Sequence, residues 1–402
     1  MKAQPADIIR QEDIKLTPEL IIIFTPLTFI AGNWYLSALF ILSAFAFLFL
    51  RYFSFKDHEI SFSQMIPWGL MLLWGLYVCY ITPDPEKAVK YYTGTMLLPF
   101  FIFILFKNIR LDEKTLTRFF DSMLISGAVI GMYSVYIFIS YNMRSDMRVP
   151  SFWNDFNMVS MYLMILFMFN LSFLIKSRHS NKIYFYLFTI TFILLGIYLT
   201  KTRGVWLAMI VSIAVFFIRK PKIIIPVFLF FGVISLLFFN IIEERFLSVV
   251  NFDQDKSSLG RLQAWYSTVL IIFKNPFFGY GFDTYYLHKY DVFPYYIVDV
   301  PHPHNTYLRA IQELGLIGAV IYFFLFFKAT VLSFTSGRSH CDPVYLKYFD
   351  GLQLSFIGLI IAFNFEPYLS LFGVTTIVVW ILVSLTFRLK DMPAAEKIKT
   401  KK

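Results

Sequence analysis

The stretch Val300–Gly318 reads VPHPHNTYLRAIQELGLIG and leads directly into an apolar run that continues to residue 335. Two of the protein's six histidines, His302 and His304, stand at the polar start of this run. A run of this length and composition predicts a membrane-spanning helix. The sequence therefore places two histidines at the entrance of a membrane helix, where an ionisable side chain needs a structural or chemical reason.

The composition of the whole chain agrees with a membrane environment. Of its 402 residues, 58% are hydrophobic and 20% aromatic, and the mean hydropathy is +0.63. A water-soluble domain has too little interior to bury so many apolar side chains. The first 17 residues are polar and mixed in charge, which favours an uncleaved first span over a signal peptide. Cys79 and Cys341 predict neither a disulfide framework nor a cysteine metal site.

Apolar runs separated by polar residues, proline or glycine predict an all-α polytopic membrane protein with about twelve transmembrane helices. The predicted spans are 18–33, 35–52, 64–82, 88–106, 119–141, 152–175, 183–200, 203–218, 223–240, 314–335, 346–364 and 368–387. They divide the chain into an N-terminal bundle (1–240), a long loop with amphipathic helices (241–313), and C-terminal helices with a basic tail (314–402).

The distribution of lysine and arginine predicts the orientation. With both termini in the cytoplasm, most basic residues fall in inner segments, and the short outer loops hold only Lys87, Lys90, Arg144, Arg148, Lys201 and Arg203. The net charge of +10 is therefore mainly a topology signal, and no nucleic-acid partner is predicted. The loop at 241–313 and the histidines then lie on the outer face.

The long outer loop has a helical core. Ser257 and Ser258, followed by GRLQAWYSTVLIIFKNP, predict a capped helix that ends at Asn275-Pro276. Its amphipathic face would lie on the membrane surface or cap a cavity; it consists of Leu262, Trp265, Tyr266, Val269, Leu270 and Phe273. Five tyrosines between residues 285 and 296 suit an interfacial aromatic belt, and they would equally suit a sugar-stacking surface.

Several outer-face cations are candidates for binding phosphate. Arg144 and Arg148 precede the sixth span, Lys201 and Arg203 interrupt the short turn LTKTRGVW, and Arg261 opens the loop helix. Arginine presents a fixed fork of donors that matches phosphate oxygens. Snorkelling at the ends of spans is the structural alternative for each of them.

The histidines allow three interpretations. His302 and His304 could be structural, could bind a metal, or one could act as a general base. No Cys, Asp or Glu stands nearby at metal-ligand spacing, so neither a metal nor another cofactor is expected. Asn305 could orient the ring or a substrate. Four acidic residues are scattered and are interpreted as structural; they are Asp155, Glu243, Glu244 and Glu366.

Other reaction types lack support in the sequence. There is no P-loop, no G-x-S-x-G and no D-x-D signature, so a cytoplasmic, nucleotide-driven reaction is unsupported. Together, the arginines and the histidine predict a reaction at the outer face on a substrate that carries phosphate. Arginine would hold the phosphate, and a histidine would take a proton from a hydroxyl.

These residues resemble the O-antigen ligase and polymerase superfamily of bacterial membrane proteins. His304-Asn305, nine residues, Gly315, two residues and Gly318 fit the ligase pattern H-[NSQ]-x9-G-x-x-[GTY]. TKTRGVW around Arg203 and SSLGRLQAW around Arg261 are similar to the family's arginine motifs, and FGYGFDTY at 278–285 is similar to its G-x-G segment. SFWNDFNM at 151–158, which includes Asn157, resembles the entrance of the sixth span, although Asp155-Phe156 departs from the usual Asn-Pro-Asn.

The resemblance, which covers about residues 140–335 by motif, implies a fold of the GT-C glycosyltransferase kind in the bacterial inner membrane, with the active site on the periplasmic face. It implies transfer of a glycan from undecaprenyl diphosphate to a sugar hydroxyl of lipid A–core oligosaccharide, without metal and with inversion. By motif, His304 would be the base, and Arg203 and Arg261 would clamp the diphosphate. Substrate-binding roles are expected for Lys201, Asn305, Arg144, Arg148 and Asn157, and lipid is a further partner.

Two rival functions stay open at this point. A polymerase would use the same lipid-linked donor but a second lipid-linked glycan as acceptor; the histidine motif favours the ligase. A transporter of lipid-linked glycan would place charges along a path through the spans. Here the middle of the predicted spans is almost free of charge, and the polar residues gather at one face.

Overall fold

The computed structural model describes residues 17–32, 34–52, 62–109, 111–143, 147–176, 182–218, 256–293, 296, 298–339, 343–369 and 373–391. Within these ranges the regular structure is helical, and no strand occurs. Five helical segments are long and apolar enough to cross a membrane; they are Pro85–Asn108, Glu113–Ser140, Phe156–Lys176, Ile183–Thr200 and Thr306–Ser336. The predicted class, an all-α membrane protein, is thereby confirmed, while the number of twelve spans and the GT-C resemblance stay predictions.

Apart from α13, which the sequence does not predict, the helices fall where the apolar runs and the loop-helix pattern predict them. They are α1 (Pro18–Thr28), α2 (Trp34–Tyr52), α3 (Phe62–Ile81), α4 (Pro85–Tyr92), α5 (Leu98–Asn108), α6 (Glu113–Ser140), α7 (Phe156–Lys176), α8 (Ile183–Thr200), α9 (Arg203–Phe217), α12 (Lys256–Lys274), α13 (Tyr285–Val292), α14 (Thr306–Ser339), α15 (Leu346–Ala362) and α16 (Val374–Lys390). Each predicted span coincides with one or two of them except 223–240, which lies outside the described residues.

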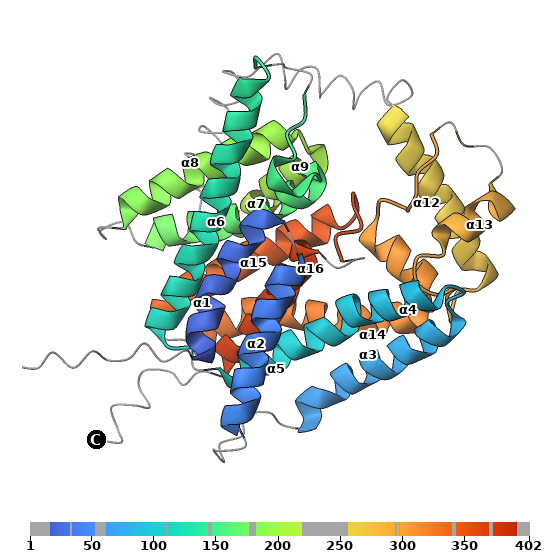
Figure 1. Cartoon of the computed structure of the whole chain (residues 1–402), viewed down its shortest axis with the longest axis horizontal. Helices are drawn as coiled ribbons and strands as arrows, with labels where there is room; N and C mark the ends of the chain where they lie inside the picture. The colour runs from blue at the N-terminus through green and yellow to red at the C-terminus, as the bar shows by residue number, and fades with distance from the viewer. Residues whose placement is uncertain are drawn as a thin grey trace, which may run out of the picture.

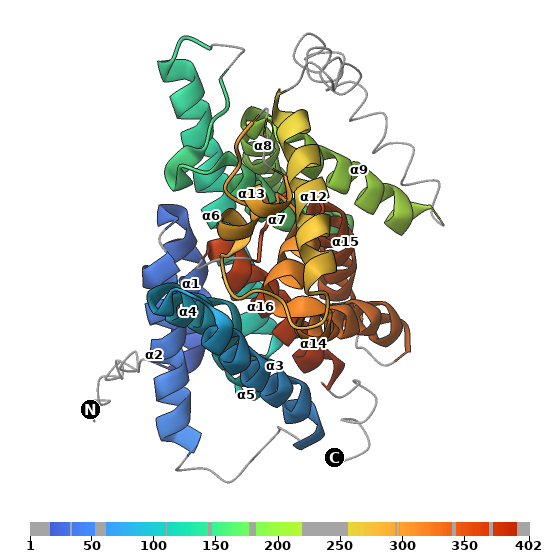
Figure 2. The same ribbon diagram turned by 90° about the vertical axis from the view of Figure 1, so that its right-hand side faces the viewer.

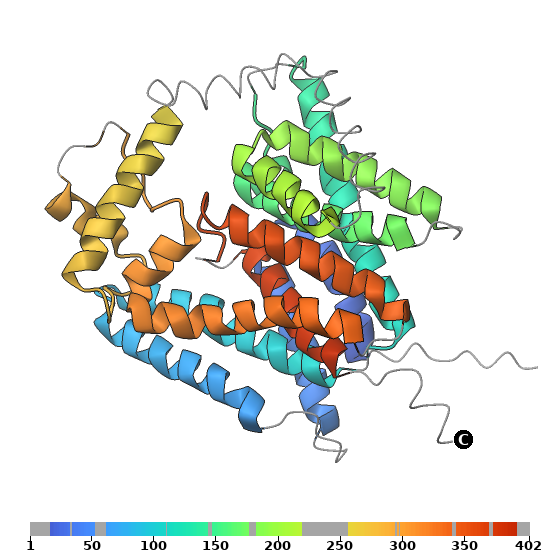
Figure 3. The same ribbon diagram turned by 180° about the vertical axis from the view of Figure 1, so that it is seen from behind.

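Helix α7 is the most enclosed of the five candidate membrane spans. In its most apolar window 83% of the residues are buried, and it packs against α8 and α15. Helix α14 lies against α3, α15 and α16. Figures 1 and 3 show α12 and α13 together at one end of the bundle, beside the start of α14, and Figure 2 views the molecule from that end. The loop helices therefore cover the end of the bundle where the histidines lie.

Helix α14 is interrupted at Gly315, whose φ of 71° lies in the left-handed region. The interruption frees backbone carbonyls that an unbroken helix would use. The loop at 276–281 satisfies them, because Tyr280 N donates to Gln312 O and Gly281 N donates to Glu313 O, both at 3.0 Å. In return, Leu316 N donates to Pro276 O at 2.8 Å. The G-x-G segment and the glycine of the histidine motif thus form one backbone crossing.

The crossing has no room for side chains at its glycines. A Cβ on Gly315 would lie 2.2 Å from Phe277 O, and one on Gly279 would lie 2.4 Å from Gly315 N. Gly318 packs against the indole of Trp74 on α3, and that indole donates to Leu314 O at 2.9 Å. The spacing of glycines in the histidine motif therefore has a packing reason.

A buried ion network ties this crossing to α4. The guanidinium of Arg309, only 4% exposed, donates to Glu313 at 2.7 Å and to Asp283 at 3.2 Å. It also donates to the hydroxyl of Tyr91 at 3.2 Å, and Lys87 pairs with Asp283 at 3.0 Å. A buried cation is tolerated where anions surround it in this way. The network fixes the first turns of α14, directly after the histidines.

Helix α12 has the predicted end but presents a different face to the protein. It spans Lys256–Lys274, so the two serines lie inside its first turn and not at its cap. The predicted apolar face is largely exposed at Leu262, Tyr266, Val269 and Phe273. Mostly small residues are buried instead, because they allow close approach to α13 and α14; they include Gly260, Ala264, Ser267 and Thr268. The exposed apolar face suits contact with lipid.

Candidate active site

His304 and Glu366 lie side by side, although 62 positions separate them in the chain. The turn between α15 and α16 brings the carboxylate to the start of α14. Thr306 joins the two segments, because its amide donates to Phe363 O at 2.7 Å and its hydroxyl donates to Glu366 O at 2.6 Å. His304 itself has a φ of 49°, an uncommon left-handed conformation for histidine. Strained backbone of this kind clusters at functional sites.

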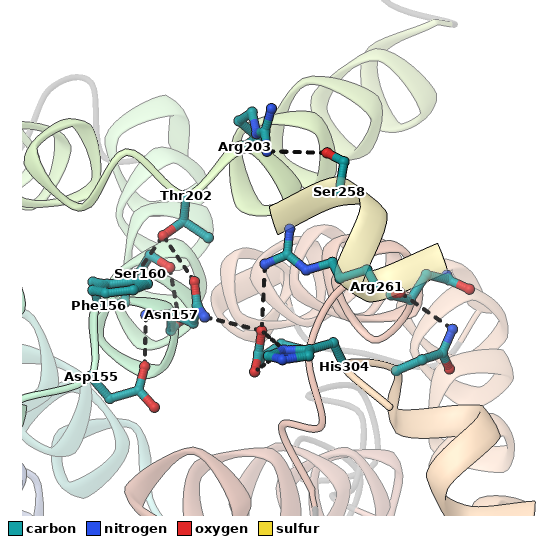
Figure 4. A network of polar contacts seen from close by, with 12 residues as sticks. Asp155, Phe156, Asn157, Ser160, Thr202, Arg203, Ser258, Arg261 and His304 are labelled. Atoms are coloured by element: carbon teal, nitrogen blue, oxygen red, sulfur yellow. Dashed lines mark hydrogen bonds and ion pairs between the residues drawn. The ribbon is translucent and has the colours of Figure 1, made fainter. Parts of the chain in front are cut away.

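The carboxylate of Glu366 is the centre of a polar cluster. Nδ1 of His304 lies 3.0 Å from both of its oxygens, and only 6% of the Glu366 side chain is exposed. Asn157 Nδ2 donates to Oε2 at 3.0 Å, and Nη2 of Arg261 lies 3.9 Å from the same oxygen. Figure 4 shows His304, Arg261 and Asn157 converging on this group. A hydrogen bond from Nδ1–H to Glu366 would leave Nε2 as the proton acceptor of His304.

A small polar pocket of about 90 Å³ opens beside this cluster. Four of the charged residues that line it are cations, and one is an anion: Arg148, Lys201, Arg203 and Arg261 against Glu366. Ser257 and Thr202 add hydroxyl groups to the lining. The excess of positive charge suits an anionic group, and arginine forks suit phosphate oxygens in particular.

Two of the pocket cations sit at helix ends. Arg203 is the first residue of α9, and its Nη2 donates to the hydroxyl of Ser258 on α12 at 3.5 Å. Figure 4 shows this contact at the edge of the cluster. Lys201 ends α8 in the left-handed conformation with a φ of 51° and is buried. The short turn between α8 and α9 thus places both Lys201 and Arg203 in the lining of the pocket.

Arg148 and Asn157 form hydrogen bonds that hold the Glu366 carboxylate in place. The guanidinium of Arg148 stacks 3.4 Å above the ring of Phe156 and donates to Thr200 O at 2.9 Å. It also donates to Asn157 Oδ1 at 3.2 Å, which leaves the amide nitrogen of Asn157 pointing to Glu366. The two residues therefore connect the α8–α9 turn to the carboxylate.

The remaining predicted residues lie elsewhere. Asn305 is the N-cap of α14: its Oδ1 accepts from the amides of Tyr307 and Leu308 at 2.9 and 3.0 Å. Its Nδ2 donates to Asn364 O at 3.3 Å, so the side chain is occupied by backbone contacts. Arg144 lies outside the described residues.

Glu366 was interpreted as structural in the sequence and lies instead at the centre of the site. One signal could have found it, because the predicted topology puts the turn between the last two spans on the same face as His304. Asp155 has a capping role: its carboxylate accepts from Asn157 N at 2.8 Å and Met158 N at 3.1 Å. The sequence has no acidic residue at metal-ligand spacing from the histidines, but the fold brings Glu366 to them. Ligand atoms of His302, His304 and Glu366 lie within 4.8 Å of one another.

The fold and the pocket define an all-helical membrane protein with a cationic, histidine-bearing site at one end of its bundle. Residues 187–323 match the family model described as O-antigen ligase, a segment that includes Arg203, Arg261, His304 and both glycines of the histidine motif. This match supports the resemblance to the O-antigen ligase and polymerase superfamily that the motifs predict. A protein of this kind is a membrane glycosyltransferase-like enzyme of O-antigen processing. No curated protein matches the chain.

Proposed function

We propose that this protein is an O-antigen ligase that transfers a glycan from undecaprenyl diphosphate to a sugar hydroxyl of lipid A–core oligosaccharide. The observation that carries the proposal is the pocket in which four cations meet the His304–Glu366 pair. A diphosphate is the anion that such a set of forks and charges suits. In this proposal the pocket faces the periplasm from the inner membrane, and residues 241–313 form the periplasmic part of the site.

In the proposed reaction, His304 acts as general base. Nε2 takes the proton of the acceptor hydroxyl while the hydroxyl oxygen forms a bond to the anomeric carbon of the donor sugar. Glu366 accepts the hydrogen bond from Nδ1–H, which selects the neutral tautomer with a free Nε2. When the ring becomes an imidazolium, the adjacent carboxylate stabilises its charge.

The bond from the anomeric carbon to the diphosphate oxygen breaks in the same step, and its electron pair leaves with undecaprenyl diphosphate. Arg203 and Arg261 stabilise the charge that develops on this leaving group, the electrostatic role that metal ions have in other phosphate-transfer sites. Displacement in one step inverts the configuration of the anomeric carbon. A diphosphate leaves without a general acid, so the site needs only one acid–base residue.

An apolar groove along α14 supports a donor with a long hydrocarbon chain. The groove runs from Tyr307 and Ile311, near the site, to Phe327 and Val331 further along the helix, and its lining is almost entirely apolar. A polyprenyl chain in this groove would place its diphosphate near the start of α14.

Deletion of the gene in its host tests the ligase against the polymerase. If the protein is a ligase, lipopolysaccharide electrophoresis will show core without any O-chain. Core that carries a single repeat unit would identify a polymerase, and an unchanged ladder would contradict both functions. Restoration by a plasmid copy controls for effects on neighbouring genes.

Substitution Glu366→Gln tests the role of the carboxylate. We expect kcat for glycan transfer to fall at least about tenfold, with KM for the donor little changed, because the neutral amide no longer stabilises the imidazolium. Steady-state kinetics on the purified enzyme measure both constants, and Glu366→Asp should recover part of the loss. An unchanged kcat, or a loss confined to KM, would contradict a role in orienting the base.

A further inference from the structure

His302 is packed beside His304, and its ring forms no hydrogen bond with the part of the chain that the structure describes. The centroids of the two rings lie 4.2 Å apart, and Nδ1 of His302 is buried with no partner among the described residues. A neutral imidazole carries one lone pair that can bind a cation. Nothing in the proposed transfer reaction uses it.

His302 completes a set of metal-ligating atoms. Two imidazole nitrogens and a carboxylate oxygen, from His302, His304 and Glu366, lie within 4.8 Å of one another. Imidazole and carboxylate are ligands that Zn²⁺ takes at about 2.0–2.2 Å in tetrahedral sites, which puts neighbouring ligand atoms about 3.3 Å apart. The pair of His304 Nδ1 and Glu366 is already at 3.0 Å. Only His302 has to move closer, and its Nδ1 has no hydrogen bond to lose.

The cations of the pocket oppose a further positive charge, and Glu366 is the anion of the lining that offsets them. Arg261 lies 3.9 Å from Glu366, and its side chain is 23% exposed, so it can turn away from a bound ion. Arg309, whose charge also acts on His302, is paired with Asp283 and Glu313. Asn157 would keep its hydrogen bond to the second carboxylate oxygen, which holds the ligand in place. Water would fill the fourth position of the ion.

We propose that His302, His304 and Glu366 form an inhibitory zinc site that competes with catalysis. The inference rests on the proposed function, because inhibition follows from the role of His304 as base. Zinc on Nδ1 binds the tautomer whose proton is on Nε2. That tautomer cannot accept the proton of the acceptor hydroxyl. Glu366 would then bind the zinc ion and no longer accept a hydrogen bond from Nδ1–H. Loss of zinc restores the catalytic tautomer.

Metal binding is measured on the full-length protein without an affinity tag, purified in detergent and stripped with EDTA. Titration with ZnCl₂ in a calorimeter should give one ion per chain, and Co²⁺ should give the visible absorption of a tetrahedral site. His302→Phe, which keeps a ring of similar shape against His304, should weaken binding at least about tenfold. His288→Phe, which removes a histidine from α13, should bind like the wild type. No saturable binding, or equal binding by His302→Phe, would overturn the proposal.

Glycan transfer supplies the second measurement. One equivalent of ZnCl₂ should inhibit the wild type and EDTA should reverse the inhibition, whereas His302→Phe should keep basal activity and need at least about tenfold more zinc. Activation by zinc, or equal inhibition of both proteins, would overturn the inhibitory role. If the purified protein binds zinc as expected but shows no transferase activity, the proposed function is contradicted and the metal site is supported.

Discussion

Replacement of His304 by glutamine is expected to lower the rate of glycan transfer by about 10²–10⁴-fold, the range that a general base contributes. The amide can still donate to Glu366, so the pair at the start of α14 keeps a hydrogen bond and the protein should fold. The amide cannot take a proton from the acceptor hydroxyl. Transfer from a purified lipid-linked donor to purified lipid A–core, followed by gel electrophoresis, measures the effect.

His288→Gln is the matched control for this substitution. His288 lies on α13, with its Nδ1 3.6 Å from Asp291, and its ring contacts Tyr280. It does not line the cationic pocket, so its replacement should leave transfer within about threefold of the wild type. A His304→Gln enzyme that transfers glycan at the wild-type rate would exclude His304 as the base.

Substitution Gly315→Ala should destabilise the protein strongly. The new Cβ would lie 2.2 Å from Phe277 O, and the φ of 71° strains any side chain. Strain and overpacking each cost about 1–3 kcal/mol, so we expect the melting temperature in detergent to fall by on the order of 5 °C. Intrinsic fluorescence during heating measures the change.

Gly69→Ala makes the same chemical change where it should do no harm. Gly69 lies within α3, and a Cβ there meets nothing within 4 Å. Because alanine favours helix over glycine by about 1 kcal/mol, the melting temperature should stay constant or rise slightly. Equal loss of stability in both variants would show that the crossing at Gly315 has no special role.

The sequence predicts the helices well and their packing poorly. Hydrophobic length and breaks locate every described helix of the bundle, because lipid demands long apolar segments. For α12 the sequence leaves two places for the apolar face, the membrane surface or a cavity, and only the structure shows that this face is largely exposed. A helix that lies against lipid can expose Tyr266 and Phe273 and bury Ala264 and Ser267.

The site is predictable where it depends on local motifs. His304, Arg203 and Arg261 stand in short, recognisable patterns, and the structure brings His304 and Arg261 to the same carboxylate and both arginines to one pocket. Glu366 and the proximity of His302 to it depend on how the last helices pack, which local spacing does not encode. Asn305 stands inside the motif, but its side chain caps α14, a role that the motif alone does not predict.

The hydrogen bonds of Thr306 with the turn after α15 also have a consequence for biosynthesis. Glu366 follows α15 in the chain, and Phe363, Glu366 and Tyr368 all bond to the threonine that follows the His304-Asn305 pair. A nascent chain that has emerged only as far as α14 carries its histidine and arginines but lacks the carboxylate that orients the ring. If the proposed reaction is right, transfer activity requires that α15 and the turn after it have been inserted.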